Sequence, residues 1–178
     1  RIVTPHAAVI PRLPEVPVHV EAYSSPQEVR EEEFSPAYAL PADAPLIIPA
    51  DDLYALDNAV RTPARVLSYG AADTATARIR NSDFYEIEGS VVGMKADVTI
   101  HGEQGSLMVK GSVGTTQLLP IVAAIATASA FNISLTEALK ALEAYEPPPG
   151  RGRLLTGKNG SIIIDDSYNA SPVAVEEA

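Results

Sequence analysis

The sequence contains no cysteine, which excludes disulfide bonds, thiolate metal sites and thiol nucleophiles. Positive charge is scarce as well: 13 lysines and arginines stand against 23 aspartates and glutamates, and the net charge is −10 at pH 7. Because nucleic acids and anionic membranes are bound by clustered cations, we expect neither as a partner. No apolar run reaches the length of a membrane span, and we expect no signal peptide. Together these absences favour a cytoplasmic protein.

What the sequence does contain is typical of a folded globular chain. Its 178 residues are 46% hydrophobic, enough to bury a substantial core in one domain or in one domain plus part of another. The chain starts at Arg1 and not at methionine, and it stops at Ala178 within what resembles the first turns of a helix. We therefore expect it to be part of a longer protein.

Residues 7–70 alternate between apolar runs and helix starts. Ser25, Pro26 and Glu28 have the order of a capping box with proline in the first turn, so a helix is predicted to start there. Pro36 is expected to end or kink it by about Ser35. The remaining predicted elements are strands at 7–10, 46–48 and 65–70 and a helix at 53–60. This order predicts a parallel sheet with right-handed crossovers.

Residues 77–111 change to an alternation of period two, which is typical of antiparallel strands. We expect a hairpin across residues 102–105, with Val98 and Ile100 opposite Leu107 and Val109.

Two helices are predicted next, in residues 115–131 and after Ser134. Pro120 is tolerable in the first of them only within its first turn, and Ser134 with Glu137 forms a second capping box. The prolines at 147–149 then end the helical region and form a stiff connector. We take this connector as the domain boundary, with one domain at 1–148 and the start of another at 149–178.

A polar cluster follows the connector. Residues 154–156 and 161–164 flank Asn159-Gly160, a pair that favours a tight hairpin turn. The second of these runs is expected to be a buried strand, and it leads into Asp165-Asp166. Ligands of α/β sheets bind at the carboxyl ends of strands, so these carboxylates are the first candidates for a site. The alternative is that they cap a helix before Pro172.

The string Asp-Asp-Ser-Tyr-Asn-Ala-Ser-Pro at 165–172 closely resembles the one that opens the C-terminal domain of Mur ligases. The form it takes here is similar to that of the family branch that adds D-alanyl-D-alanine. Three other segments match the family in the same order along the chain: residues 18–25, Ala50-Asp51-Asp52 and Pro149-Gly150-Arg151. The resemblance implies an α/β fold: part of a mainly parallel P-loop-type sheet, an antiparallel β subdomain, and the first strands of a Rossmann-like C-terminal domain.

The resemblance also implies a chemistry, an ATP-dependent amide ligation of cytoplasmic peptidoglycan precursor synthesis. The substrates would be a UDP-MurNAc-peptide, with either diaminopimelate or lysine as its third residue, and D-Ala-D-Ala. The cofactors would be ATP and Mg²⁺, with activation through an acyl phosphate. The family's phosphate loop would lie upstream of Arg1, so we expect this chain alone to be inactive.

Several residues of this chain occupy positions at which the family binds nucleotide or metal. Asp166 would accept hydrogen bonds from ribose, and Arg151 would hold ribose or phosphate, a role for which Arg153 is the competitor. His19 would lie near magnesium, or else be an ordinary structural histidine. The remaining candidates for the nucleotide pocket are Tyr168, Asn169 and Gln117.

The chain departs from the family pattern at four places. Glu33 takes the position of a carbamylated lysine that binds metal, so it is a candidate ligand and catalytic group or simply a solvated glutamate. Gln117 and Pro120 replace two asparagines, and Pro49 replaces a third. These departures leave two hypotheses open: an active ligase, or a Mur-ligase-like domain that binds without catalysing.

Overall fold

The computed structural model describes residues 4–13, 22–168 and 175 of the chain. Within them, six strands form one sheet and two strands form another. The strands are β1 (Ala8–Val9), β2 (Pro45–Pro49), β3 (Arg65–Gly70), β4 (Ala77–Ile87), β5 (Ser90–Ile100), β6 (Glu103–Lys110), β7 (Arg153–Thr156) and β8 (Ile162–Asp165). The helices are α1 (Pro26–Tyr38), α2 (Leu53–Ala59), α3 (Leu119–Ala130) and α4 (Leu135–Leu142), with short 3₁₀ turns η2 (Thr115–Leu118) and η3 (Lys158–Gly160).

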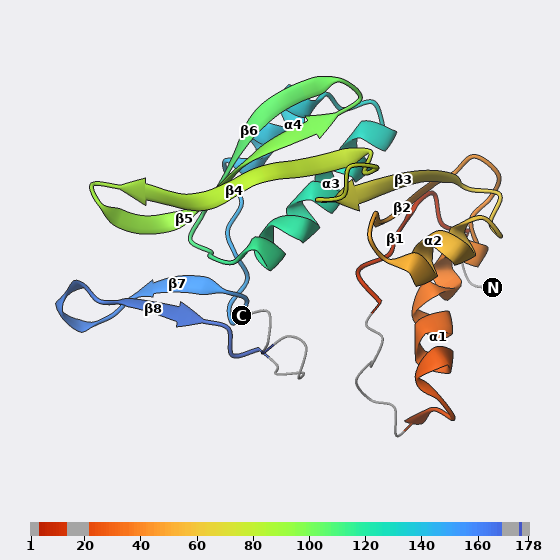
Figure 1. The fold of residues 1–178 in the computed structure, drawn as a ribbon, viewed down its shortest axis with the longest axis horizontal. Helices are drawn as coiled ribbons and strands as arrows, with labels where there is room; N and C mark the ends of the chain where they lie inside the picture. Colours follow the sequence, from red (N-terminus) through yellow and green to blue (C-terminus); the bar gives the residue numbers. More distant parts are fainter. Residues whose placement is uncertain (1–3, 14–21, 169–174, 176–178) are drawn as a thin grey trace.

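The main sheet has the strand order β1-β2-β3-β4-β5-β6. Strands β1 to β4 pair in parallel, and β4, β5 and β6 pair antiparallel, which confirms the mixed α/β fold expected from the sequence. β4 pairs with β3 only through Tyr69 with Ala77 and Gly70 with Arg78. The antiparallel strands therefore continue well past the parallel ones, and the molecule is elongated (Figure 1).

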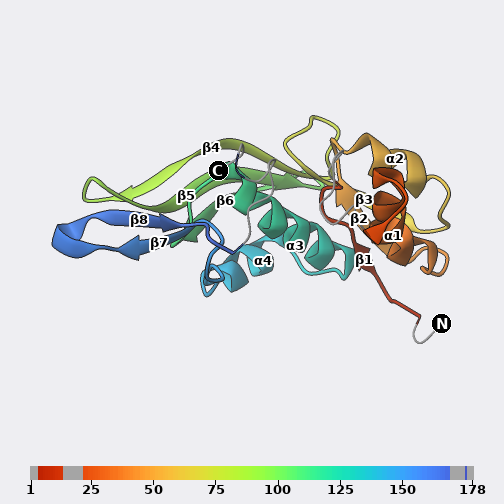
Figure 2. The same cartoon turned by 90° about the horizontal axis from the view of Figure 1, so that it is seen from below.

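Strand β2 is the centre of the parallel region, because its alternate side chains enter two different cores. Ile47 belongs to a large cluster that includes residues of β3 to β6, α3 and α4. Leu46 and Ile48 belong to a second cluster that includes residues of α1 and α2. The period-two geometry of a strand thus gives a layer of helix on each face, with α3 on the opposite side from α1 and α2 (Figures 1 and 2).

Helix α1 starts where the sequence predicts but does not stop there. Ser25 caps it, since the Glu28 amide donates to the Ser25 hydroxyl at 3.3 Å. The expectation that the helix ends by Ser35 is wrong, because α1 runs on to Tyr38 with Pro36 inside it. Phe34 and Ala37, on either side of the proline, are fully buried. Their packing offsets the amide hydrogen bond that proline cannot make.

The later helices agree with the sequence. The predicted capping box at Ser134 forms completely: the Glu137 amide donates to the Ser134 hydroxyl at 3.3 Å, and the Ser134 amide donates to the Glu137 carboxylate at 3.1 Å. Pro120 lies in the first turn of α3, where its missing amide hydrogen has no intrahelical partner to lose. The helix predicted at 115–131 is divided into η2 and α3.

Two expectations about the strands are wrong. β5 and β6 join through His101 and Gly102, whose φ angles of 48° and 85° suit a tight two-residue turn, so Val98 lies opposite Gly105 and not opposite Leu107 or Val109. The run 162–164, expected to be buried, is 50–60% exposed. β8 pairs only with β7 in the second sheet, so no layer covers it within the described residues.

Candidate functional site

The connector before β7 and the segment after β8 meet at the base of the two-stranded hairpin. The Tyr168 amide donates to the Gly150 carbonyl at 3.1 Å. The guanidinium carbon of Arg151 lies 4.1 Å from the centre of the Tyr168 ring, a cation–π contact. Both side chains are exposed. A planar cation and an aromatic ring are therefore stacked together and open to solvent.

Two adjacent carboxylates hold the connector in place. Asp166 accepts a hydrogen bond from the Gly152 amide at 2.9 Å. Asp165 accepts from the Gly150 amide at 3.2 Å and from the Ser167 hydroxyl at 2.5 Å. These bonds favour the ionised form: the Ser167 hydroxyl, followed by the backbone amides and the nearby Arg153, lowers the pKa of Asp165.

Gly152 brings the connector against the start of the η2–α3 helical segment. It is buried and has a φ of +59°, and a Cβ added to it would lie 2.8 Å from the Val113 carbonyl oxygen and 3.0 Å from Gln117 Cγ. Ser112, which is also buried, donates its hydroxyl hydrogen to the Gly152 carbonyl at 3.1 Å. Glycine is thus required here, and Gln117 packs directly against the connector.

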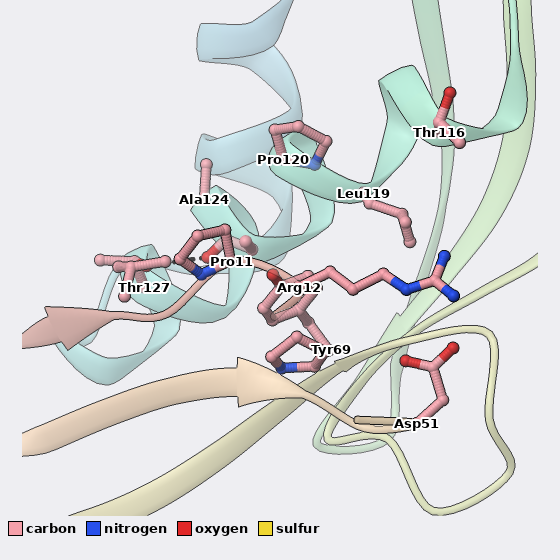
Figure 3. A pocket seen from close by; sticks show the side chains of 12 residues that line it. Pro11, Arg12, Asp51, Tyr69, Thr116, Leu119, Pro120, Ala124 and Thr127 are labelled. Carbon is pink, nitrogen blue, oxygen red and sulfur yellow. Dashed lines mark hydrogen bonds between the residues drawn. The ribbon is translucent and has the colours of Figure 1, made fainter. Parts of the chain in front are cut away.

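A cavity of about 730 Å³ lies on the other side of this helical segment, at the carboxyl ends of β1, β2 and β3 (Figure 3). In Figure 3 the side chains of Arg12 and Asp51 extend toward one another at one end of it. Much of the wall is apolar, including both prolines that stand where the family has asparagine. The lining residues are Val9, Pro11, Arg12, Pro49, Asp51, Tyr69, Thr116, Leu119, Pro120, Ala123, Ala124 and Thr127.

Asp52, next to the cavity, has a structural role. It is buried, caps α2 by accepting from the Ala55 amide at 3.0 Å, and accepts from the Leu13 amide at 2.8 Å. The hydroxyl of Tyr69 donates to the Ile10 carbonyl at 3.2 Å. Burial, with the nearby charges of Asp51 and Asp52, raises the pKa of Tyr69 to about 12. Of the Asp51-Asp52 pair, only Asp51 lines the cavity.

The residues predicted from the sequence to bind nucleotide are in part brought together. Arg151 and Tyr168 are stacked, Asp166 holds Gly152, and Gln117 packs on that glycine. His19 and Asn169 lie outside the described residues. The alternative arginine, Arg153, is partly buried and acts on the charge of Asp165.

Glu33 lies apart from this group, on an exposed position of α1. In both views α1 is at the opposite end of the molecule from β7 and β8 (Figures 1 and 2). Among the described residues, no three or more side chains of the metal-ligating kind gather in one place. None of the described helices is long and apolar enough to cross a lipid bilayer.

Two features of this region were missed from the sequence. The cavity residues Arg12 and Tyr69 lie near the carboxyl ends of predicted parallel strands, which was the available signal for them. The hydrogen bond from the Gly150 amide to Asp165 had no such signal, because it joins residues 15 apart and one partner is a backbone group.

Comparison with solved structures defines the class of fold. The chain has the fold found in part of the Mur ligases, which include MurC from Thermotoga maritima, with a TM-score of 0.70 at 17% identity over 98% of this chain. No protein-family model matches the sequence, and no curated protein matches it either.

Within that class, similarity to MurF structures extends over 99% of the chain. MurF from Acinetobacter baumannii has a TM-score of 0.81 at 18% identity, and MurF from Thermotoga maritima, in complex with ADP, has 0.79 at 21%. The chain spans only 37% and 38% of the length of those two proteins. At such identities the matches establish a shared fold.

Proposed function

We propose that this chain is part of an ATP-dependent amide ligase of the Mur type, acting in peptidoglycan precursor synthesis. The reaction would join D-Ala-D-Ala to a UDP-MurNAc-tripeptide. The likeness to MurF structures over 99% of the chain supports this proposal, as does the Asp165–Pro172 string that resembles the D-alanyl-D-alanine-adding branch. One of the similar structures, from Thermotoga maritima, is in complex with ADP.

The observation that carries the proposal is the convergence of Arg151, Tyr168, Asp166 and Gln117 around Gly152. These side chains come from three separate stretches of sequence, and the resemblance to the family predicts each of them as a nucleotide contact. Their chemistry suits a nucleotide: a guanidinium binds phosphate or ribose oxygens, a carboxylate accepts from ribose hydroxyls, and an exposed aromatic ring offers a stacking surface.

In the proposed reaction these residues bind and orient the nucleotide. ATP, when bound, supplies the phosphoryl group that activates the substrate carboxylate as an acyl phosphate. Arg151 offsets negative charge at the hairpin base, and the stacked Tyr168 ring limits the directions in which the guanidinium can point. Asp166 holds the connector through the Gly152 amide, one residue after Arg151.

The magnesium requirement is a separate part of the proposal, to be carried by His19 and Glu33. Because Glu33 is exposed and Glu32 is its exposed neighbour on the same helix, the two form a matched pair for mutation. If Glu33 binds magnesium, Glu33→Gln raises the Mg²⁺ concentration needed for half-maximal activity, while Glu32→Gln does not. If activity depends on Mg²⁺ concentration in the same way in both variants, Glu33 is a solvated glutamate that does not bind the metal.

The direct test uses the full-length protein with ATP, Mg²⁺, UDP-MurNAc-tripeptide and D-Ala-D-Ala. We expect phosphate release that depends on both the tripeptide and the dipeptide. Comparing tripeptides that end in diaminopimelate or lysine identifies the peptide substrate whose carboxylate is activated. The 178-residue chain alone should release none. An absence of phosphate release by the full-length protein would contradict the ligase assignment.

A second candidate function, nucleotide or precursor binding without catalysis, is favoured by one observation. Pro49 and Pro120 line the cavity where the family pattern has asparagine, and proline offers no side-chain hydrogen-bond donor. Binding of ADP by the full-length protein without phosphate release would select this alternative.

A further inference from the structure

Asp165 accepts three hydrogen bonds from described residues at the hairpin base. Its carboxylate accepts from the Gly150 amide at 3.2 Å, the Ser167 amide at 3.3 Å and the Ser167 hydroxyl at 2.5 Å. Among the residues that the structure describes, Asp166 accepts a hydrogen bond from the Gly152 amide. Asp165 is also the last residue of β8, opposite Arg153 in β7, so its backbone is held by the hairpin.

The Gly150 backbone that Asp165 holds is tightly constrained. Gly150 has a φ of +72°, and a Cβ added to it would lie only 2.8 Å from the Tyr168 amide nitrogen. The same amide donates to the Gly150 carbonyl. Gly150 is therefore held at both of its backbone polar groups, its amide by Asp165 and its carbonyl by the Tyr168 amide.

Arg151 is the residue between the two glycines whose amides the carboxylates hold. Gly150 is bound by Asp165 on one side of it, and Gly152 by Asp166 on the other. With its backbone fixed at both ends, the arginine side chain leaves the connector in one direction and lies over the ring of Tyr168. Removal of either carboxylate takes away one of the hydrogen bonds that hold this short segment.

We propose that Asp165 is a positioning residue for nucleotide binding, an inference that rests on the proposed function. It acts on the nucleotide through Arg151: by holding Gly150 it keeps the guanidinium stacked on Tyr168 and presented to the ligand. A group fixed before binding loses less conformational entropy on binding, so the carboxylate raises affinity without touching the ligand.

The test measures the dissociation constant of ADP with Mg²⁺ for the full-length protein by isothermal titration calorimetry. Asp165→Ala is expected to weaken binding about tenfold, the effect of one lost charge-assisted hydrogen bond. Ser167→Ala keeps the bond to Gly150 and should weaken binding only about threefold. Asp83→Ala, which removes an exposed carboxylate from β4, is the matched control and should leave the affinity unchanged.

A double-mutant cycle with Arg151→Ala separates positioning from a general structural role. If Asp165 acts through Arg151, Asp165→Ala costs little further affinity once Arg151 is gone. Independent, additive losses would overturn the inference. So would a lowered thermal unfolding midpoint with an unchanged dissociation constant, because that pattern marks a purely structural contact.

The outcomes also separate this inference from the proposed function. Wild-type protein that does not bind ADP contradicts the proposed function itself. Wild-type protein that binds ADP, together with an Asp165→Ala variant of equal affinity, contradicts only the role of Asp165. If Asp165→Ala does not fold, Asp165→Asn and Ser167→Ala take its place. Each is expected to bind ADP more weakly than the wild type. Unchanged affinity would count against the inference.

Discussion

Strands β2 and β8 contain nearly the same apolar triplet and have opposite environments. Leu46-Ile47-Ile48 in β2 is fully buried, whereas Ile162-Ile163-Ile164 in β8 is 50–60% exposed. β2 has a strand on each side and a helical layer on each face, while β8 has only β7 beside it. The burial of a strand is thus decided by its neighbours, and an apolar run shows only that burial is favourable where a partner exists.

Truncation of matched isoleucines gives the largest expected difference between the two strands. Ile48→Ala opens a cavity in a closed core and should cost about 3 kcal/mol of unfolding free energy. Ile163→Ala removes a half-exposed side chain and should cost less than about 1 kcal/mol. Urea denaturation of the 178-residue chain measures both. Similar losses would show that β8 is covered in solution.

The next largest effect on stability is expected at Asp52, in the aspartate pair that follows β2. Asp52→Ala removes the cap of α2 and leaves two buried amides without their acceptor, so a loss of about 2 kcal/mol is expected. Asp57→Ala, an exposed substitution in the same helix, is the control and should change stability by less than about 0.5 kcal/mol. Equal effects in urea denaturation would refute the structural role of Asp52.

Alkaline pH should destabilise the parallel region of the main sheet through Tyr69 in β3, the strand next to β2. Its folded-state pKa is raised to about 12 from an ordinary value of 10, so its contribution to stability is complete below pH 10 and is lost as the pH rises through about 12. An ultraviolet titration should show one late-ionising tyrosine that is absent from Tyr69→Phe. Superimposable titration curves for the two proteins would contradict this.

Acid should lower the stability of the hairpin through Asp165. The loss should be the smallest of these effects, because Asp165 is near the surface. Its folded-state pKa lies below the ordinary 3.8, so its contribution is present above that value and is lost as the pH falls through the lowered one. In an acid titration by NMR, the amide shifts of Gly150 and Ser167 should move together with the carboxylate. Amide shifts that stay constant would mean that the bonds do not depend on charge.

Local chemistry made much of the fold predictable. The caps at Ser25 and Ser134 and the alternation of strands and helices depend on residues close in sequence, and the structure agrees with each of them. The site was partly predictable for another reason: Arg151, Asp166 and Tyr168 belong to strings that resemble a known family, and the fold brings them together.

The errors arose where distant contacts decide the outcome. Pro36 continues a helix because Phe34 and Ala37 are buried by other elements, which the sequence of α1 alone does not show. The register of β5 and β6 depends on His101 taking a positive φ that is unusual for a residue other than glycine. The exposure of 162–164 and the bonds of Asp165 likewise depend on what lies beside them.

The Gly152 carbonyl gives the hairpin a mechanical linkage to the main sheet. It accepts from the Val113 amide at 3.0 Å and from the Ser112 hydroxyl at 3.1 Å, while the Leu154 amide donates to the Gly111 carbonyl at 2.8 Å. The hairpin is therefore joined to the segment after β6 by hydrogen bonds and to Gln117 by direct packing. Gly152 therefore couples the position of the hairpin to that of the η2–α3 segment, and a side chain at this position would displace the two from each other.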